Sequence, residues 1–179
     1  VPGPDKIEPL LDLADMFQIG ARNAQNYDLL EQIAKLGRPV LLKRGLASTV
    51  EEWLTAAEYL IVNGCTQVVL CERGLRSFDP STRNLLDLGA VAVAKQLSHL
   101  PVIVDPSHAA GARRLVPALA RAGLAVGADG LIVEAHPDPI NAFSDAPQQL
   151  ESGKFAGFLA NLAPWIELAR QERLAATTE

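Results

Sequence analysis

The chain has 179 residues, of which 49% are hydrophobic, 21% charged and 5% aromatic, and it carries a net charge of −5. This profile is that of an ordinary globular protein with enough length for one core. The acidic balance argues against nucleic acid as a partner, although a local group of Arg and Lys can still bind a phosphorylated small molecule.

Two further features narrow the class of protein. No apolar run approaches the ~20 residues needed to cross a bilayer, so we expect no membrane partner. The two cysteines, Cys65 and Cys71, do not form a disulfide framework, which favours a reducing compartment. We therefore expect a cytoplasmic protein and a single domain over residues 1–179.

Helix-like segments alternate along the chain with apolar runs that end in charged or polar residues. Near-continuous Val, Ile and Leu in these runs indicate strands buried on both faces, and hence a parallel sheet covered by helices. A full (β/α)8 barrel needs about 250 residues, so this α/β chain suits an open sheet or part of a barrel. The predicted strands lie in residues 15–22, 39–45, 68–74, 101–108 and 130–137, and the predicted helices in 5–13, 26–36, 49–62, 82–97, 109–122 and 155–174.

The first three predicted strands each end in a cation, namely Arg22, Lys43 and Arg73. The carboxyl ends of parallel strands meet at one edge of a sheet, so these side chains should converge. Converging cations suit a phosphate or a carboxylate, with Arg donating two hydrogen bonds and Lys supplying a point charge. The alternative is that each cation pairs with a surface carboxylate or meets water.

The last two strands are followed by a different set of side chains: His108, Glu134 and Asp145. One imidazole and two carboxylates form a mixed nitrogen and oxygen set that suits a divalent transition metal. The alternative is that His108, which follows a Ser, only lies at a helix start. Cys71 lies deeper along its strand than Arg73, and we interpret it as a buried core thiol.

Five motifs together resemble 3-deoxy-arabino-heptulosonate 7-phosphate synthase, in its short bacterial and archaeal form related to 3-deoxy-octulosonate 8-phosphate synthase. The similarity runs through Asp145-Ala-Pro-Gln-Gln-Leu150. It implies a (β/α)8 barrel of which this chain covers about the last five β/α units. The motifs are Gln18-Ile-Gly-Ala-Arg-Asn23, Leu42-Lys-Arg-Gly45, Leu70-Cys-Glu-Arg-Gly74, Asp105-Pro-Ser-His-Ala-Ala-Gly111 and Val133-Glu-Ala-His-Pro137.

The resemblance implies an aldol-type transferase that condenses phosphoenolpyruvate with erythrose 4-phosphate and releases phosphate, at the entry to the shikimate pathway to aromatic amino acids. It also implies a divalent metal (Mn, Fe, Co or Zn) and a homo-oligomer for the complete protein. By resemblance, Arg22, Lys43 and Arg73 bind phosphoenolpyruvate, the Ala21 amide contacts its phosphate, and Lys43 and His108 are catalytic. His108, Glu134 and Asp145 match three of the four metal ligands of the family.

The chain also departs from the family it resembles. The first three strands of the family, with a metal-binding Cys and a Lys-Pro-Arg-Thr-type segment for the sugar phosphate, have no counterpart in these 179 residues. Three interpretations therefore remain open. The chain is part of an active heptulosonate synthase, a catalytically incomplete fragment that binds phosphoenolpyruvate or metal, or part of an octulosonate synthase.

Overall fold

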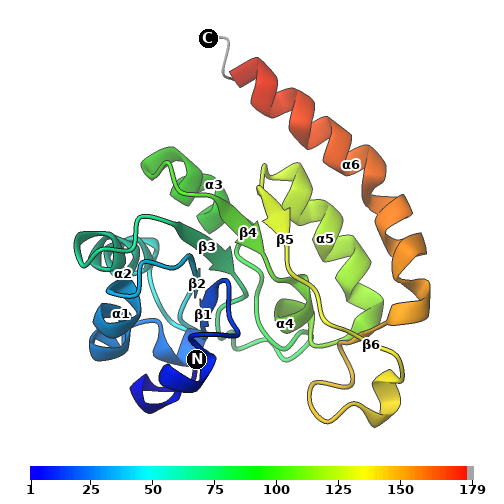
Figure 1. Cartoon of the computed structure of the whole chain (residues 1–179). Helices are drawn as coiled ribbons and strands as arrows, with labels where there is room; N and C mark the ends of the chain where they lie inside the picture. The colour runs from blue at the N-terminus through cyan, green and yellow to red at the C-terminus, as the bar shows by residue number, and fades with distance from the viewer. Residues whose placement is uncertain (177–179) are drawn as a thin grey trace.

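The computed structural model describes residues 1–176 of the chain. Its centre is a parallel sheet in which the strands follow one another in chain order (Figure 1). Neighbouring strands keep a continuous register, as where Lys43 lies beside Cys71. All five predicted strands are confirmed in place, as β1 (Phe17–Ile19), β2 (Val40–Lys43), β3 (Val68–Glu72), β4 (Val102–Val104) and β5 (Gly130–Leu131).

The helices that connect the strands form the outer layer of the curved sheet (Figure 1). Each parallel connection must return to the same end of the sheet, which places a helix between successive strands. The core lies between the two layers, where Trp53 is 1% exposed and donates from Nε1 to the carbonyl of Leu42 at 3.2 Å. The outer helices are α1 (Tyr27–Ala34), α2 (Val50–Val62), α3 (Leu88–Leu97) and α5 (Val116–Ala125).

Side-chain caps determine where these helices begin. Thr49 and Glu52 form a capping box at the start of α2, which satisfies two backbone donors that would otherwise lack partners. Asn26 caps α1 by accepting from the amide of Leu29, and Asp87 caps α3 by accepting from the amide of Ala90.

Three predicted helices differ from the structure. Residues 5–13 form two short 3-10 turns, η1 (Pro4–Lys6) and η2 (Glu8–Leu10), because Pro9, inside the predicted helix, cannot donate a backbone hydrogen bond. The predicted helix over 82–97 begins only at Leu88, since the backbone amides of Arg83 and Asn84 donate instead to Ala110 and Ala109, at the end of the short helix that follows β4. The predicted helix over 109–122 is divided at Gly111 (φ 65°) between α4 (Pro106–Ala110), η4 (Arg113–Leu115) and α5.

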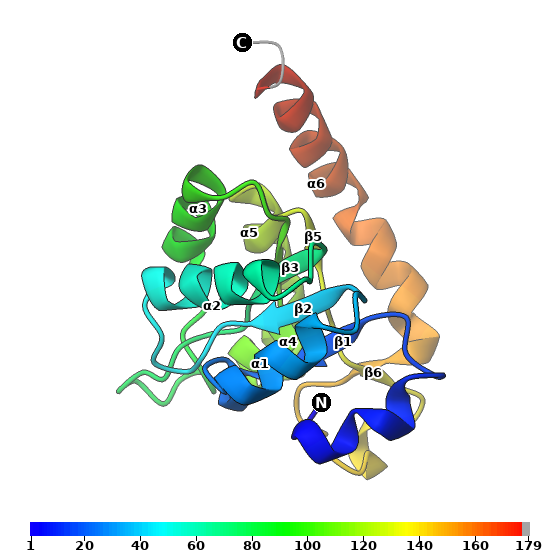
Figure 2. The ribbon, with the colours of Figure 1, turned by 60° about the vertical axis from the view of Figure 1, so that its left-hand side comes forward.

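The end of the described chain is the long helix α6 (Phe155–Ala176), which follows a small parallel pair, β6 (Ala135–His136) and β7 (Leu150–Glu151). The start of α6 packs on α5, where Leu162 is 2% exposed. Beyond that contact the helix projects away from the sheet in both views (Figures 1 and 2). Among the described residues, no helix combines the length and apolarity needed to cross a bilayer.

Candidate functional site

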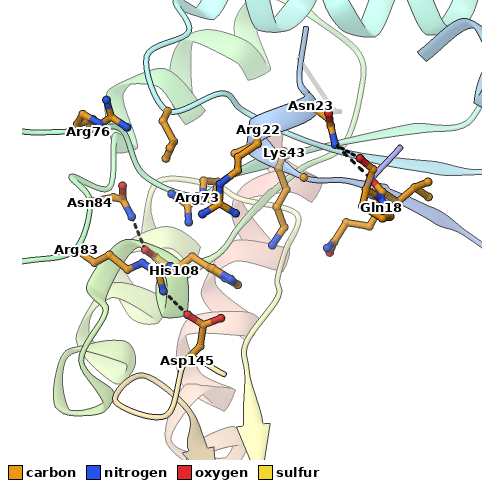
Figure 3. A pocket seen from close by; sticks show the side chains of 15 residues that line it. Gln18, Arg22, Asn23, Lys43, Arg73, Arg76, Arg83, Asn84, His108 and Asp145 are labelled. Atoms are coloured by element: carbon orange, nitrogen blue, oxygen red, sulfur yellow. Dashed lines mark hydrogen bonds and ion pairs between the residues drawn. The ribbon is translucent and has the colours of Figure 1, made fainter. Parts of the chain in front are cut away.

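A cavity of about 800 Å³ lies at the carboxyl edge of the five-stranded sheet. Arg22, Lys43, Arg73, His108 and Asp145 all line it (Figure 3). The structure therefore brings together cations and metal-ligand candidates that are up to 123 positions apart, from Arg22 to Asp145. The cavity has two sides, one of cations from the first three strands and one formed by His108 and Asp145. Glu134, the third metal-ligand candidate, lies beside His108 but is not among the residues that line the cavity.

The cation side combines buried and exposed positive charges. Lys43 is the last residue of β2 and is 6% exposed, whereas Arg73 follows β3 and is 7% exposed. Arg22 lies in η3 (Ala21–Asn23) and reaches the cavity from an exposed position; Ala21 also lines the cavity. Within the described residues, Nη1 of Arg73 is the buried side-chain nitrogen or oxygen atom that has no hydrogen-bond partner.

This unpartnered atom is informative because buried polar groups nearly always have a partner. Burial lowers the pKa of Arg73, against the opposing effect of the Asp105 charge, but a guanidinium stays protonated at neutral pH. A buried positive charge with a free donor, beside Lys43, suits an anion that would enter the cavity.

Asp105 joins the two sides of the cavity. It caps α4 and is 1% exposed. One oxygen, Oδ2, accepts from Lys43 Nζ at 2.7 Å and lies 2.8 Å from His108 Nδ1. Burial alone would raise the pKa of Asp105, but the hydrogen bond from His108 and the charge of Lys43 outweigh it and lower the pKa. The ionised carboxylate therefore holds Lys43 and His108 in place together.

This contact with Asp105 fixes the orientation of the His108 ring. When Nδ1 carries the proton donated to Asp105, Nε2 presents its lone pair to the opposite side. Nε2 lies 3.8 Å from Oε1 of Glu134. One ligand atom each from His108, Glu134 and Asp145 lies within 4.8 Å of the others. A mixed nitrogen and oxygen set at this spacing fits a divalent cation, so the structure brings the three predicted ligands together.

Asp145 reaches the site with an unusual backbone. Its φ of 53° is the positive φ recorded outside glycine in the described chain, a conformation that Asp tolerates better than most residues. Arg83 donates to Oδ1 of Asp145 at 2.5 Å (Figure 3), and this hydrogen bond lowers the pKa of Asp145.

Sequence reasoning did not select Asp105, Arg83 or Gln148 as site residues. Asp105 stood within the Asp-Pro-Ser-His motif, directly after a strand, which was a usable signal. Gln148 stood within the segment from Asp145 to Leu150 that shares the resemblance, but in a loop away from any predicted strand end, and Arg83 fell inside a predicted helix. Cys71 is buried, as predicted, and burial raises the pKa of its thiol. His136 faces its own loop, where Nδ1 accepts from the amide of Asp138 at 3.0 Å.

Comparison with known proteins identifies a protein family whose sequence model matches most of the chain. The model of the DAHP synthetase I family matches residues 1–168 of the chain. A phospho-2-dehydro-3-deoxyheptonate aldolase of Thermotoga maritima is 52% identical over 149 residues, which are 83% of this chain and 44% of the relative. A 2-dehydro-3-deoxyphosphooctonate aldolase of Pectobacterium carotovorum is 36% identical over 91% of this chain and 61% of the relative.

A solved structure of a related protein has the same fold as this chain. The truncated form of 3-deoxy-D-arabino-heptulosonate 7-phosphate synthase from Thermotoga maritima superposes with a TM-score of 0.90 at 47% identity, over 93% of this chain and 63% of that one. The predicted fold class, part of a (β/α)8 barrel, is confirmed by this likeness and by the parallel sheet. The chain spans between about two fifths and two thirds of the length of the relatives it matches.

Proposed function

The chain belongs to the DAHP synthetase I family, and we propose that it forms the phosphoenolpyruvate- and metal-binding part of a 3-deoxy-7-phosphoheptulonate synthase. The reaction joins phosphoenolpyruvate to erythrose 4-phosphate with release of phosphate, as the first step toward aromatic amino acids. The relative that is 52% identical carries the name of a heptonate aldolase, which supports the seven-carbon product.

The observation that carries the proposal is the unpartnered Nη1 of Arg73 at the cation side of the cavity. Phosphoenolpyruvate carries a phosphate and a carboxylate, and Arg22, Lys43 and Arg73 together offer enough donors for both groups. The backbone amide of Ala21, at the start of η3, lies on the same side and suits the phosphate.

His108, Glu134 and Asp145 are the residues proposed to hold a divalent cation, of which Mn, Fe, Co and Zn fit the donor set. When bound, such a cation acts as a Lewis acid toward a carbonyl oxygen. His108 contributes Nε2 because Asp105 engages its Nδ1. In the family that the chain resembles, the fourth metal ligand is a Cys, which has no counterpart in these 179 residues.

Lys43 is the residue proposed to move a proton. An aldol-type condensation converts the aldehyde oxygen into a hydroxyl, which requires a proton at that oxygen. Lys43 lines the cavity, and its Nζ is held 2.7 Å from Asp105. This contact fixes the position of the Lys43 ammonium, next to the same carboxylate that orients His108.

The test combines calorimetric titration of the chain with phosphoenolpyruvate in the presence of Mn²⁺ and a phosphate-release assay after addition of erythrose 4-phosphate. We expect this chain to bind phosphoenolpyruvate and to support phosphate release when the sugar-phosphate segment of the family is also present, and we expect both to be lost in Lys43→Met. Lys95→Met is the matched control, since Lys95 pairs with Asp129 at 2.8 Å, at the amino ends of β4 and β5.

Binding without release would reject catalysis by this chain and favour the binding fragment. Absence of phosphoenolpyruvate binding would reject the proposal.

The second candidate function is that of an octulosonate synthase, favoured by the 36% identity to the octonate aldolase of Pectobacterium carotovorum. The two reactions differ by one carbon in the sugar phosphate. Release of phosphate with arabinose 5-phosphate in place of erythrose 4-phosphate would support this alternative, and we expect the four-carbon sugar to be preferred.

A further inference from the structure

Arg83 reaches the site from a segment whose backbone is fixed by contacts with α4. Its amide donates to the carbonyl of Ala110 at 3.2 Å, and the next residue, Asn84, donates from its side chain to the carbonyl of His108 at 2.8 Å. Gly111 lies so close that a Cβ added there would collide with Arg83. The position of Arg83 is therefore set by the same short helix that presents His108.

From this position Arg83 contacts two groups on the carboxylate side. Its Nη1 donates to Oδ1 of Asp145 at 2.5 Å and to Oε1 of Gln148 at 2.8 Å. Gln148 is 1% exposed, and its Nε2 in turn donates to Oε2 of Glu134. One guanidinium nitrogen is thus linked to both carboxylates, directly to Asp145 and through the Gln148 amide to Glu134.

Each link engages one oxygen of its carboxylate and leaves the other. Glu134 uses Oε2 for Gln148, and its Oε1 is the atom 3.8 Å from His108 Nε2. Asp145 uses Oδ1 for Arg83. A carboxylate with one oxygen bound in this way offers the second oxygen as a single ligand atom and cannot turn freely.

We propose that Arg83 and Gln148 are positioning residues that orient Asp145 and Glu134 to bind a divalent cation through one oxygen each. This role rests on the proposed metal site and extends it to two residues outside the ligand set. Neither residue belongs to the proposed ligand set, so their effect would pass through the two carboxylates.

The charge of Arg83 allows this role to be separated from simple electrostatics. A positive charge near the site repels a cation, so removal of the charge alone should strengthen metal binding. Loss of orientation should weaken it, typically by about 10- to 100-fold for residues that support metal ligands. The direction of the change in affinity therefore distinguishes a positioning role from a mere counter-charge.

The experiment measures the dissociation constant for Mn²⁺ by calorimetry on the whole chain and on three variants. Arg83→Met removes both links, and Gln148→Met removes only the link to Glu134 while leaving the charge of Arg83 in place. Arg76→Met is the control, because Arg76 lines the same cavity and its replacement removes an equal charge. Thermal unfolding in the presence of a chelator confirms that each variant is folded.

We expect Mn²⁺ to bind about 10- to 100-fold more weakly to Arg83→Met, less weakly to Gln148→Met, and no more weakly to Arg76→Met. Arg83→Lys should recover part of the loss, since an ammonium can still donate to Asp145. Unchanged or tighter binding by both Arg83→Met and Gln148→Met would overturn the positioning role while leaving the metal site intact. If the unsubstituted chain does not bind Mn²⁺, both the metal site and this inference are wrong.

Discussion

Two buried arginines that follow neighbouring strands have opposite surroundings. Arg44, after β2, is 4% exposed and donates to the carbonyl of Ser48 at 2.9 Å and to Glu72 and Asp87 at 3.0 Å each. It also lies 5.9 Å from the ring centre of Trp53. Arg73, after β3, is 7% exposed, and its Nη1 has no partner within the described residues.

The difference shows that a cation at the end of a strand is not by itself a sign of a binding site. The region around Arg44 is a finished ion-pair network in which protein carboxylates neutralise the charge. The region around Arg73 is a cavity wall in which Nη1 has no protein partner and can donate a hydrogen bond to an anionic ligand. Two predictions test this contrast, and a third tests Asp105, whose charge acts on Arg73; they follow in decreasing order of expected effect.

Replacing Arg44 with Met should strongly destabilise the chain. Glu72 is fully buried and would lose its charged partner, and such a loss typically costs about 3–5 kcal/mol. Urea unfolding followed by circular dichroism measures the effect. A loss below about 1 kcal/mol, the value of an exposed ion pair, would mean that the network around Arg44 contributes little to stability.

The same replacement at Arg73 should reduce ligand binding and leave stability nearly unchanged. A hydrogen bond to a charged group contributes about 1.5–3 kcal/mol, so phosphoenolpyruvate should bind about 10- to 150-fold more weakly to Arg73→Met. The free energy of unfolding without ligand should stay the same or rise, because an incompletely paired buried charge is removed. Calorimetry and urea unfolding measure the two quantities. A destabilisation equal to that of Arg44→Met would remove the contrast.

Replacing Asp105 with Asn should give a smaller, pH-dependent effect on stability. The pKa of Asp105 is lowered in the folded chain, so its ionised form stabilises the fold at neutral pH. That contribution is lost as the pH falls below the unfolded value of about 3.9 and through the folded pKa. The difference in melting temperature between the chain and Asp105→Asn should therefore be largest near neutral pH and shrink in acid. A constant difference from pH 7 to pH 3 would contradict the prediction.

Much of the fold was predictable because its signals are local. Apolar runs, turn residues and caps located all five strands and the helices α1, α2 and α6 within a few residues. The strand ends then implied which side chains converge, and the structure brings Lys43, Arg73, His108 and Asp145 to one cavity.

The features of the fold and the site that could not be predicted depend on contacts between segments far apart in the sequence. Arg83 meets Asp145 across 62 positions and Gln148 across 65, and no local pattern encodes such a pairing. The apolar spacing of residues 82–97 favoured a helix throughout, but the segment before Asp87 is held instead by backbone hydrogen bonds from Arg83 and Asn84 to the end of α4. Local propensity was therefore overridden at the place where the site gains a residue.

The left-handed backbone of Asp145 also limits how this position can vary. Besides glycine, Asn and Asp are the residues that adopt this conformation most readily, and both carry a side-chain oxygen at the same place. A descendant of this chain could therefore exchange the carboxylate for an amide in one substitution without altering the loop. The backbone at this position tolerates loss of the charge more readily than a change in shape, so a lineage could abandon this proposed metal ligand while keeping the fold.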